Sequence, residues 1–213
     1  MKLLYFISHT LLNFLFRIFY GLKVVGYKEA PLKGAVIVAV NHQSFFDPLI
    51  AGTAVERELY YFAKQEIFQT PVIGTLAKAH NAFPTKRGFF DIGAVRQAAN
   101  VLQEGNALLM FPEGTRSRTG KLLKAKMGIG MVAYHNRADI VPMYLHGTFR
   151  LRECLFRYPG LIVNIGQRIP IRKYLEMKLP RKEIYQQISN DVMSHIAELK
   201  RQTLQKIKKR RSS

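Results

Sequence analysis

Residues 41–48, NHQSFFDP, place an imidazole, His42, and a carboxylate, Asp47, five positions apart. The apolar stretch at 35–40 predicts a strand directly before them, and Pro48 suits the first helical position with Asp47 as the N-cap. In a strand-to-helix turn of this kind, His42 can fold back onto the Asp47 carboxylate. A carboxylate on one ring nitrogen fixes the tautomer and leaves the other nitrogen as a base, which is half of a proton-transfer device. The alternative is that His42 only hydrogen-bonds locally at an ordinary helix start.

A second polar cluster, FPEGTRS at residues 111–117, follows the apolar stretch NALLMF. Its Pro-Glu-Gly-Thr sequence predicts a turn in which Gly114 can take a positive φ or let a ligand approach the backbone closely. Glu113 and Arg116 would project from this turn at the end of a parallel strand, where ligands bind in open α/β sheets. The alternative is an ion pair between these two side chains that closes a surface turn.

Both clusters resemble blocks of the glycerolipid acyltransferases, the lysophosphatidic acid acyltransferase family. NHQSFFD resembles the HxxxxD block of that family, and FPEGTRS resembles its third block. Residues 64–88 are similar to the second block, which ends in an aromatic-rich turn and an arginine, here Arg87. Residues 140–147, IVPMYLHG, are similar to the fourth. The resemblance covers roughly residues 24–170 and predicts an enzyme.

The resemblance implies transfer of a fatty acyl group from a thioester to the sn-2 hydroxyl of 1-acylglycerol-3-phosphate, which yields phosphatidic acid. Such a reaction needs a base for the hydroxyl proton, and histidine changes its charge near neutral pH. We therefore expect His42 to deprotonate the acceptor while Asp47 orients its ring, with direct attack on the thioester and no acyl-enzyme. Two alternatives stay open: another lysophospholipid or glycerol-3-phosphate as the acceptor, and a basic protein that only binds lipid or nucleic acid.

The acceptor's phosphate requires cations, and the family match assigns Arg87 and Arg116, each able to hold a phosphate with two parallel hydrogen bonds. Gly114 and Thr115 complete the predicted phosphate- and glycerol-binding set. Glu113 is expected either to hold a glycerol hydroxyl or to orient an arginine. The sequence FPTKR, which ends at Arg87, departs from the family, where an aliphatic residue and an acidic or polar one more often precede this arginine. The departure leaves the acceptor preference open.

The stretch from 116 to 126 contains basic residues and no acid: Arg116, Arg118, Lys121, Lys124 and Lys126. We predict that Lys121, Lys124 and Lys126 bind the acyl donor, either through the phosphates of coenzyme A or through the acidic surface of an acyl carrier protein. Lys126 also belongs to a Lys-x-Gly pair that matches the family. The alternative is a solvated basic loop.

Other catalytic patterns fail on inspection. The chain has no GxSxG elbow, which disfavours a serine hydrolase of that type. Its single cysteine, Cys154, has no histidine or lysine near it in sequence and is expected to be structural. The remaining histidines lack metal-ligand spacing, so neither a metal nor a cofactor is expected.

Composition restricts the partners. The 213 residues, 48% of them hydrophobic, suit one domain with a sizeable core. The formal net charge of +19 implies acidic partners, among them anionic membrane lipid, coenzyme A, acyl carrier protein and nucleic acid. No nucleic-acid motif is present, and the aromatic residues cluster near the N-terminus instead of alternating with basic patches, so no specific nucleic-acid partner is expected.

Residues 1–23 are predicted to form an interfacial helix. They are mostly apolar and aromatic, with a narrow polar stripe of His9, Asn13 and Arg17. An arginine makes a full membrane span costly, and no small-residue cleavage site follows. We expect this helix to lie in the membrane interface at the cytoplasmic face. The alternative is a helix packed on the domain's own core.

The rest of the chain divides into an acyltransferase domain at 24–199 and a polybasic tail at 200–213. Strand-like and helix-like stretches alternate through the domain, which predicts an α/β fold with one mixed, largely parallel sheet flanked by helices. The tail has seven basic residues between Lys200 and Arg211 and no acid. It suits an anionic membrane surface, and the alternative is a disordered, solubilising end.

Overall fold

The computed structural model describes residues 3–26, 33–85, 92–157 and 160–211. Helices and strands alternate along the chain, and the predicted α/β class is confirmed. The helical elements are α1 (Leu3–Tyr20), α2 (Asp47–Thr53), the 3-10 helix η1 (Gln65–Gln69), α3 (Pro71–Ala79), α4 (Ile92–Gln103), α5 (Gly128–Asn136), the 3-10 helix η2 (Thr148–Cys154), α6 (Arg172–Leu175) and α7 (Arg181–Arg211). The strands are β1 (Lys23–Gly26), β2 (Val36–Val40), β3 (Leu59–Lys64), β4 (Ala82–Thr85), β5 (Ala107–Met110), β6 (Asp139–His146) and β7 (Ile162–Ile165).

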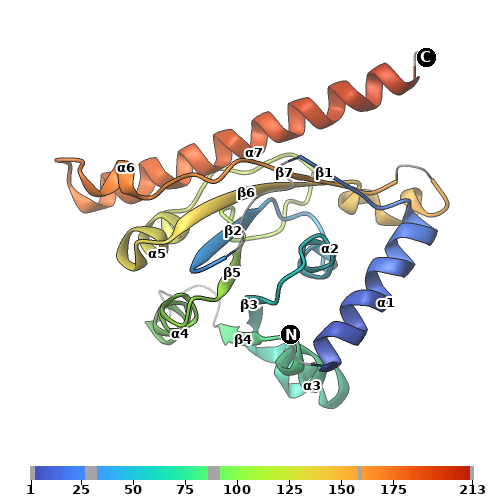
Figure 1. The fold of residues 1–213 in the computed structure, drawn as a ribbon, viewed down its shortest axis with the longest axis horizontal. Helices are drawn as coiled ribbons and strands as arrows, with labels where there is room; N and C mark the ends of the chain where they lie inside the picture. The colour runs from blue at the N-terminus through green and yellow to red at the C-terminus, as the bar shows by residue number, and fades with distance from the viewer. Residues whose placement is uncertain (1–2, 27–32, 86–91, 158–159, 212–213) are drawn as a thin grey trace.

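All of these strands form one twisted sheet in the order β1-β7-β6-β2-β5-β3-β4 (Figure 1). Neighbouring strands run parallel except at the antiparallel pair β6–β7, so the sheet is mixed and mostly parallel, as the sequence predicted. β2 lies at the centre, between β5 and β6. All five of its residues, VIVAV, are buried, which is typical of a parallel strand covered on both faces.

The side chains on the two faces of β2 belong to two different hydrophobic cores. Ile37 and Ala39 belong to the core under α4, α5 and α7, whereas Val36, Val38 and Val40 belong to the core under α1 and α2. Figure 1 shows α7 lying along one face of the sheet while α1 and α2 lie on the other. Because side chains alternate along a strand, one short apolar stretch anchors both helical layers.

The parallel pairing of β2 and β5 positions the site. Their register, from Val36 opposite Ala107 to Ala39 opposite Met110, brings both carboxyl ends to the same edge of the sheet. On the other side of β2, Asn41 continues the ladder: its side-chain amide donates to the Leu145 carbonyl, and its side-chain oxygen accepts from the Leu145 N–H. The segments that follow β2 and β5 therefore start from a fixed, adjacent pair of strand ends.

The N-terminal helix α1 turns two residues of its predicted polar stripe, His9 and Asn13, toward α2, whereas the third, Arg17, is exposed. The His9 ring lies 3.1 Å from the carbonyl oxygen of Val55, and the Asn13 amide donates to the carbonyl of Thr53 at 2.7 Å. These two carbonyls lie at the carboxyl end of α2, where a helix leaves acceptors without partners. These two contacts hold α1 on the domain, and most of the apolar side chains of α1 remain exposed.

The predicted C-terminal tail is part of a helix. α7 continues without interruption to Arg211, so the basic residues after 199 extend a helix that begins in the domain. In Figure 1 this end of α7 projects beyond the sheet.

Candidate active site

His42 and Asp47 meet in the turn between β2 and α2. The Nδ1 atom of His42 lies 2.8 Å from Oδ2 of Asp47. The carboxylate is fully buried, whereas the imidazole is 18% exposed. Because the carboxylate accepts the hydrogen bond, Nδ1 carries the proton in the neutral ring, and Nε2 presents a lone pair. The geometry that the spacing predicted is therefore present.

The position of Asp47 relative to the start of α2 differs from the prediction. Asp47 is the first residue of α2, after Phe46 at the N-cap, and it is not itself the N-cap. Its Oδ2 accepts the backbone N–H groups of Gln43 and Ser44, at 2.5 and 2.6 Å, in addition to the His42 ring. The carboxylate therefore faces back over the turn, and Pro48, which has no N–H, offers it no donor inside the helix.

Phe111 packs on the imidazole. Its ring stacks on that of His42 with centroids 3.9 Å apart and planes inclined by 15°. Together with the Asp47 hydrogen bond, this contact sets both the plane and the rotation of the ring. Phe111 was not predicted as a site residue. The available signal was its place at the start of FPEGTRS, directly after the strand that became β5.

Glu113 closes the two loops onto each other. Its side chain is 1% exposed, with Oε1 accepting the backbone N–H of His42 and Oε2 accepting that of Leu123, each at 2.8 Å. Burial raises the pKa of this carboxyl, while the two backbone hydrogen bonds and His42 oppose the rise. The sequence predicted that Glu113 would either bind a glycerol hydroxyl or orient an arginine. The structure uses both of its oxygens for backbone amides.

Further hydrogen bonds tie the same loops together. The Ser117 N–H donates to the His42 carbonyl at 2.8 Å, and the Gln43 side-chain amide donates to the Gly120 carbonyl at 2.8 Å. The expected positive φ is found at Gly114, where it is 63°. A Cβ atom added at Gly114 would lie 2.8 Å from the Lys126 side chain, so that lysine stem passes directly over the glycine. The loops form one connected unit around His42.

The predicted cations lie on the exposed rim of this unit. Arg116, Arg118, Lys121, Lys124 and Lys126 are all exposed, as is Thr115 beside them. Arg87, the other predicted phosphate ligand, lies outside the described residues. Two apolar side chains also flank the turn, because Phe45 and Phe46 are 55% and 43% exposed. The site thus combines a partly exposed histidine, hydrogen-bonded to a buried carboxylate, with solvated cationic and aromatic side chains around it.

Cys154, His80 and His135 lie in structural contacts away from this site. Cys154 is buried, and burial raises the pKa of its thiol. His80 contacts the Ser8 hydroxyl, and His135 contacts the Tyr185 hydroxyl. Within the described part of the chain, no three His, Cys, Asp or Glu side chains are grouped so that they could hold a metal ion.

Comparisons with known proteins agree on one family. The family model described as Acyltransferase matches residues 21–146, more than half of the chain. The 1-acyl-sn-glycerol-3-phosphate acyltransferase of Bacillus subtilis is 28% identical over 180 residues, 84% of this chain and 88% of that protein. The enzyme of the same name from Limnanthes douglasii is 34% identical over 157 residues, 71% of this chain and 56% of that protein.

A solved structure shares the fold. The crystal structure of the 1-acyl-sn-glycerophosphate (LPA) acyltransferase from Thermotoga maritima matches with a TM-score of 0.68 at 23% identity, covering 89% of this chain and 78% of that one. The family match includes both loops that surround His42.

Proposed function

This chain belongs to the acyltransferase family, and we propose that it transfers a fatty acyl group from a thioester to the sn-2 hydroxyl of 1-acylglycerol-3-phosphate. The product is phosphatidic acid, a phospholipid precursor. The names of the curated relatives support the choice of acceptor. The observation that carries the chemistry is the His42–Asp47 pair, buried on its carboxylate side and open on its imidazole side.

In the proposed step, Nε2 of His42 takes the proton of the acceptor hydroxyl as the hydroxyl oxygen attacks the thioester carbonyl. The new C–O bond forms, the C–S bond breaks, and the thiolate leaves with the proton that the imidazolium returns. Asp47 stabilises the imidazolium and keeps Nδ1 protonated, as in other histidine bases held by a carboxylate. Phe111 and Glu113 act as positioning residues, the first on the ring and the second on the backbone of His42.

The substrates would approach over the exposed rim. Arg116, with Gly114 and Thr115 in the same turn and Arg87 from the second block, is proposed to hold the acceptor phosphate. Lys121, Lys124 and Lys126 are proposed to hold the donor, either acyl-CoA or acyl carrier protein. The support for Arg116 and the three lysines is their charge and their exposure, in a loop that hydrogen-bonds to His42 and Gln43. Solvated cations attract anionic groups without a large desolvation cost. Arg87 rests on the family resemblance alone.

We propose that the protein acts at the cytoplasmic face of the membrane. α1 is long and apolar enough to cross a membrane by length and composition, and only 11% of it is buried. Its outward side carries the exposed leucine, isoleucine and phenylalanine side chains, while His9 and Asn13 contact the carboxyl end of α2. This arrangement favours a helix lying in the interface, where a lipid acceptor can be reached without leaving the bilayer.

The test is acyl transfer to 1-acylglycerol-3-phosphate in vesicles that contain anionic lipid, with acyl-CoA and acyl carrier protein offered separately. We expect wild type to form phosphatidic acid and His42→Ala to lose about 10² to 10⁴ in rate. His195→Ala, an exposed histidine on α7, is the matched control. Activity of His42→Ala close to wild type would exclude His42 as the base. No product with either donor, while another lysophospholipid or glycerol-3-phosphate is acylated, would exclude the proposed acceptor.

A further inference from the structure

The long helix α7 consists of two unlike parts. In the first part, the buried residues Ile184, Ile188, Val192 and Ile196 recur at helical spacing and pack on the core under α5 and β6. The last buried side chain is Thr203, which accepts a hydrogen bond from the Asn164 side chain at 3.0 Å. Residues 204–210 contain no buried side chain. At 1.5 Å per residue, roughly 10 Å of helix follows its last buried side chain.

This projecting part is strongly basic. We call residues 200–211 the basic tip. Its basic residues are Lys200, Arg201, Lys206, Lys208, Lys209, Arg210 and Arg211, and no acid occurs after Glu198. One or two cations in the last turn are expected, because the carboxyl end of a helix carries partial negative charge. A larger number needs another explanation, since like charges four residues apart, such as those of Lys206 and Arg210, destabilise a helix.

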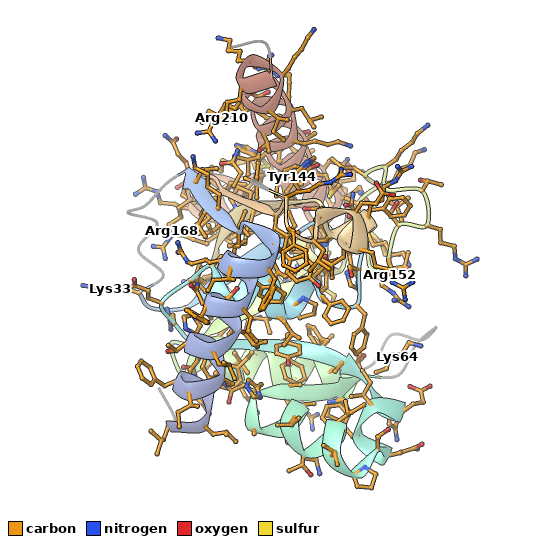
Figure 2. All side chains as sticks on the ribbon, turned by 90° about the vertical axis from the view of Figure 1, so that its right-hand side faces the viewer. Lys33, Lys64, Tyr144, Arg152, Arg168 and Arg210 are labelled. Carbon is orange, nitrogen blue, oxygen red and sulfur yellow. The ribbon has the colours of Figure 1, made fainter. Side chains whose placement is uncertain are left out.

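The basic tip shares one side of the molecule with the apolar face of α1. In Figure 1 both α1 and the C-terminal end of α7 lie at the right-hand side. Figure 2 looks at that side: α1 stands in front, Arg210 lies above it, and Arg152, Lys33 and Arg168 flank it. The exposed apolar side chains of α1 are Leu3, Leu4, Phe6, Ile7, Leu11, Phe14, Ile18 and Phe19. This apolar strip thus has cations above it and on both sides of its upper part.

We propose that the basic tip binds the anionic headgroups of the bilayer on which α1 docks. This inference rests on the proposed membrane location and adds a second contact of a different chemical kind. A single apolar anchor gives marginal, reversible binding, and firm attachment takes a second signal such as a polybasic patch. Each basic residue near an anionic surface strengthens binding several-fold and acts within about 10 Å at moderate salt.

A bilayer suits the basic tip better than a nucleic acid or an acidic protein does. The tip also carries two aliphatic side chains, Leu204, 43% exposed, and Ile207, which is half-buried. They alternate with the cations, so the same turns offer apolar contact and charge. A flat surface can meet the tip and the distant α1 at the same time.

The experiment compares two full-length variants that lose the same number of charges at opposite ends of the molecule. The tip variant is Lys206→Gln, Lys208→Gln, Lys209→Gln and Arg210→Gln. The control variant is Arg172→Gln, Lys178→Gln, Arg181→Gln and Lys182→Gln, all exposed residues in or near α6 and the start of α7. Glutamine keeps a long side chain and a good helix propensity. Co-sedimentation with vesicles is measured for phosphatidylcholine alone and for phosphatidylcholine with about one third phosphatidylglycerol, over a range of salt concentrations.

We expect the tip variant to bind the anionic vesicles at least about tenfold more weakly than wild type, and the neutral vesicles equally well. The control variant should lose no more than about threefold, through net charge alone. Equal losses in both variants, or an unchanged tip variant, would overturn the proposal. So would a tip variant that keeps vesicle binding but loses binding to RNA. Matching helical content by circular dichroism confirms that the variants fold.

Failure of the proposed function is a separate outcome. In neutral detergent micelles, the tip variant should acylate 1-acylglycerol-3-phosphate as fast as wild type, because the tip lies outside the site. Suppose that wild type makes no phosphatidic acid, yet the tip variant binds anionic vesicles more weakly than wild type does. The proposed reaction is then wrong, and the proposed lipid contact stands. If wild type is active and the tip variant binds normally, the lipid contact is wrong and the reaction stands.

Discussion

The two loops around His42 contain two contrasting regions. The first, the clamp, is formed by His42, Asp47, Phe111 and Glu113, and each of its members is held by a short hydrogen bond or a ring contact. The cationic rim, at residues 116–126, has its basic side chains exposed to solvent. The clamp has geometry that is set before any substrate arrives, whereas the rim offers charge without fixed geometry. Chemistry should therefore depend on the clamp, and substrate capture on the rim.

The sharpest test of the clamp is Asp47→Asn. The amide would turn an N–H₂ group or a neutral oxygen toward Nδ1 and remove the charge that stabilises the imidazolium. We expect kcat to fall by about 10² to 10⁴ with little change in KM. Glu183→Gln, at an exposed carboxylate in the first turn of α7, serves as the control, and steady-state kinetics is the measurement. A loss of less than about tenfold would mean that His42 does not depend on its carboxylate.

Glu113→Gln should weaken the clamp through the backbone. Glutamine has one acceptor oxygen, so one of the two amides, that of His42 or of Leu123, would lose its partner. A buried donor without a partner costs about 1 to 3 kcal/mol. We expect a loss of that size in the free energy of unfolding and roughly a tenfold to hundredfold loss of activity. Equal stability of the two proteins in urea would contradict the role assigned to Glu113.

The same variant carries a pH signature. Because burial raises the pKa of Glu113 above its usual 4.5, the folded protein binds this proton more tightly than the unfolded chain does. Stability from this group is therefore largest below the unfolded pKa and is lost as pH rises through the raised folded pKa. The difference in unfolding free energy between wild type and Glu113→Gln should grow as pH falls from 7 toward 4.5. Urea titrations across that range measure it, and a difference that shrinks would reverse the assignment.

Phe111→Leu should have a smaller effect. Leucine fills much of the same space but cannot stack on the imidazole. The His42 ring can then tilt about its hydrogen bond to Asp47, which alone does not fix the plane of the ring. We expect about a tenfold decrease in kcat, since small errors in position lower the rate strongly. Phe111→Tyr keeps the stacked ring and should retain most of the activity. If the two variants lose activity equally, stacking is not what the position supplies.

The rim should respond most weakly and in a different parameter. Changing Lys121, Lys124 and Lys126 together to glutamine should raise KM for the acyl donor by about two- to tenfold and leave kcat nearly unchanged, because exposed charges contribute little each. The wild-type KM should rise with salt, and the triple variant should show a flatter dependence. A large fall in kcat would place one of these lysines in the clamp and remove the distinction between the two regions.

The sequence could predict contacts that are close along the chain. His42 and Asp47 are separated by one short turn between a strand and a helix. Few conformations of such a turn keep the two side chains apart. The α/β class also follows from the alternation of apolar strands and helices. Gly114 is similar, because its positive φ is a property of its own turn.

The tertiary structure decided the contacts that cross the sheet. Glu113 is 71 residues from His42 and reaches its backbone only because β5 pairs beside β2, a strand order that alternation does not encode. Phe111 stacks on the imidazole for the same reason. In α1 the sequence predicted the polar stripe, but only packing showed that His9 and Asn13 contact α2 and that most of the apolar side chains face outward. Periodicity along one segment sets which residues share a face, and the neighbours of that face depend on how distant segments pack together.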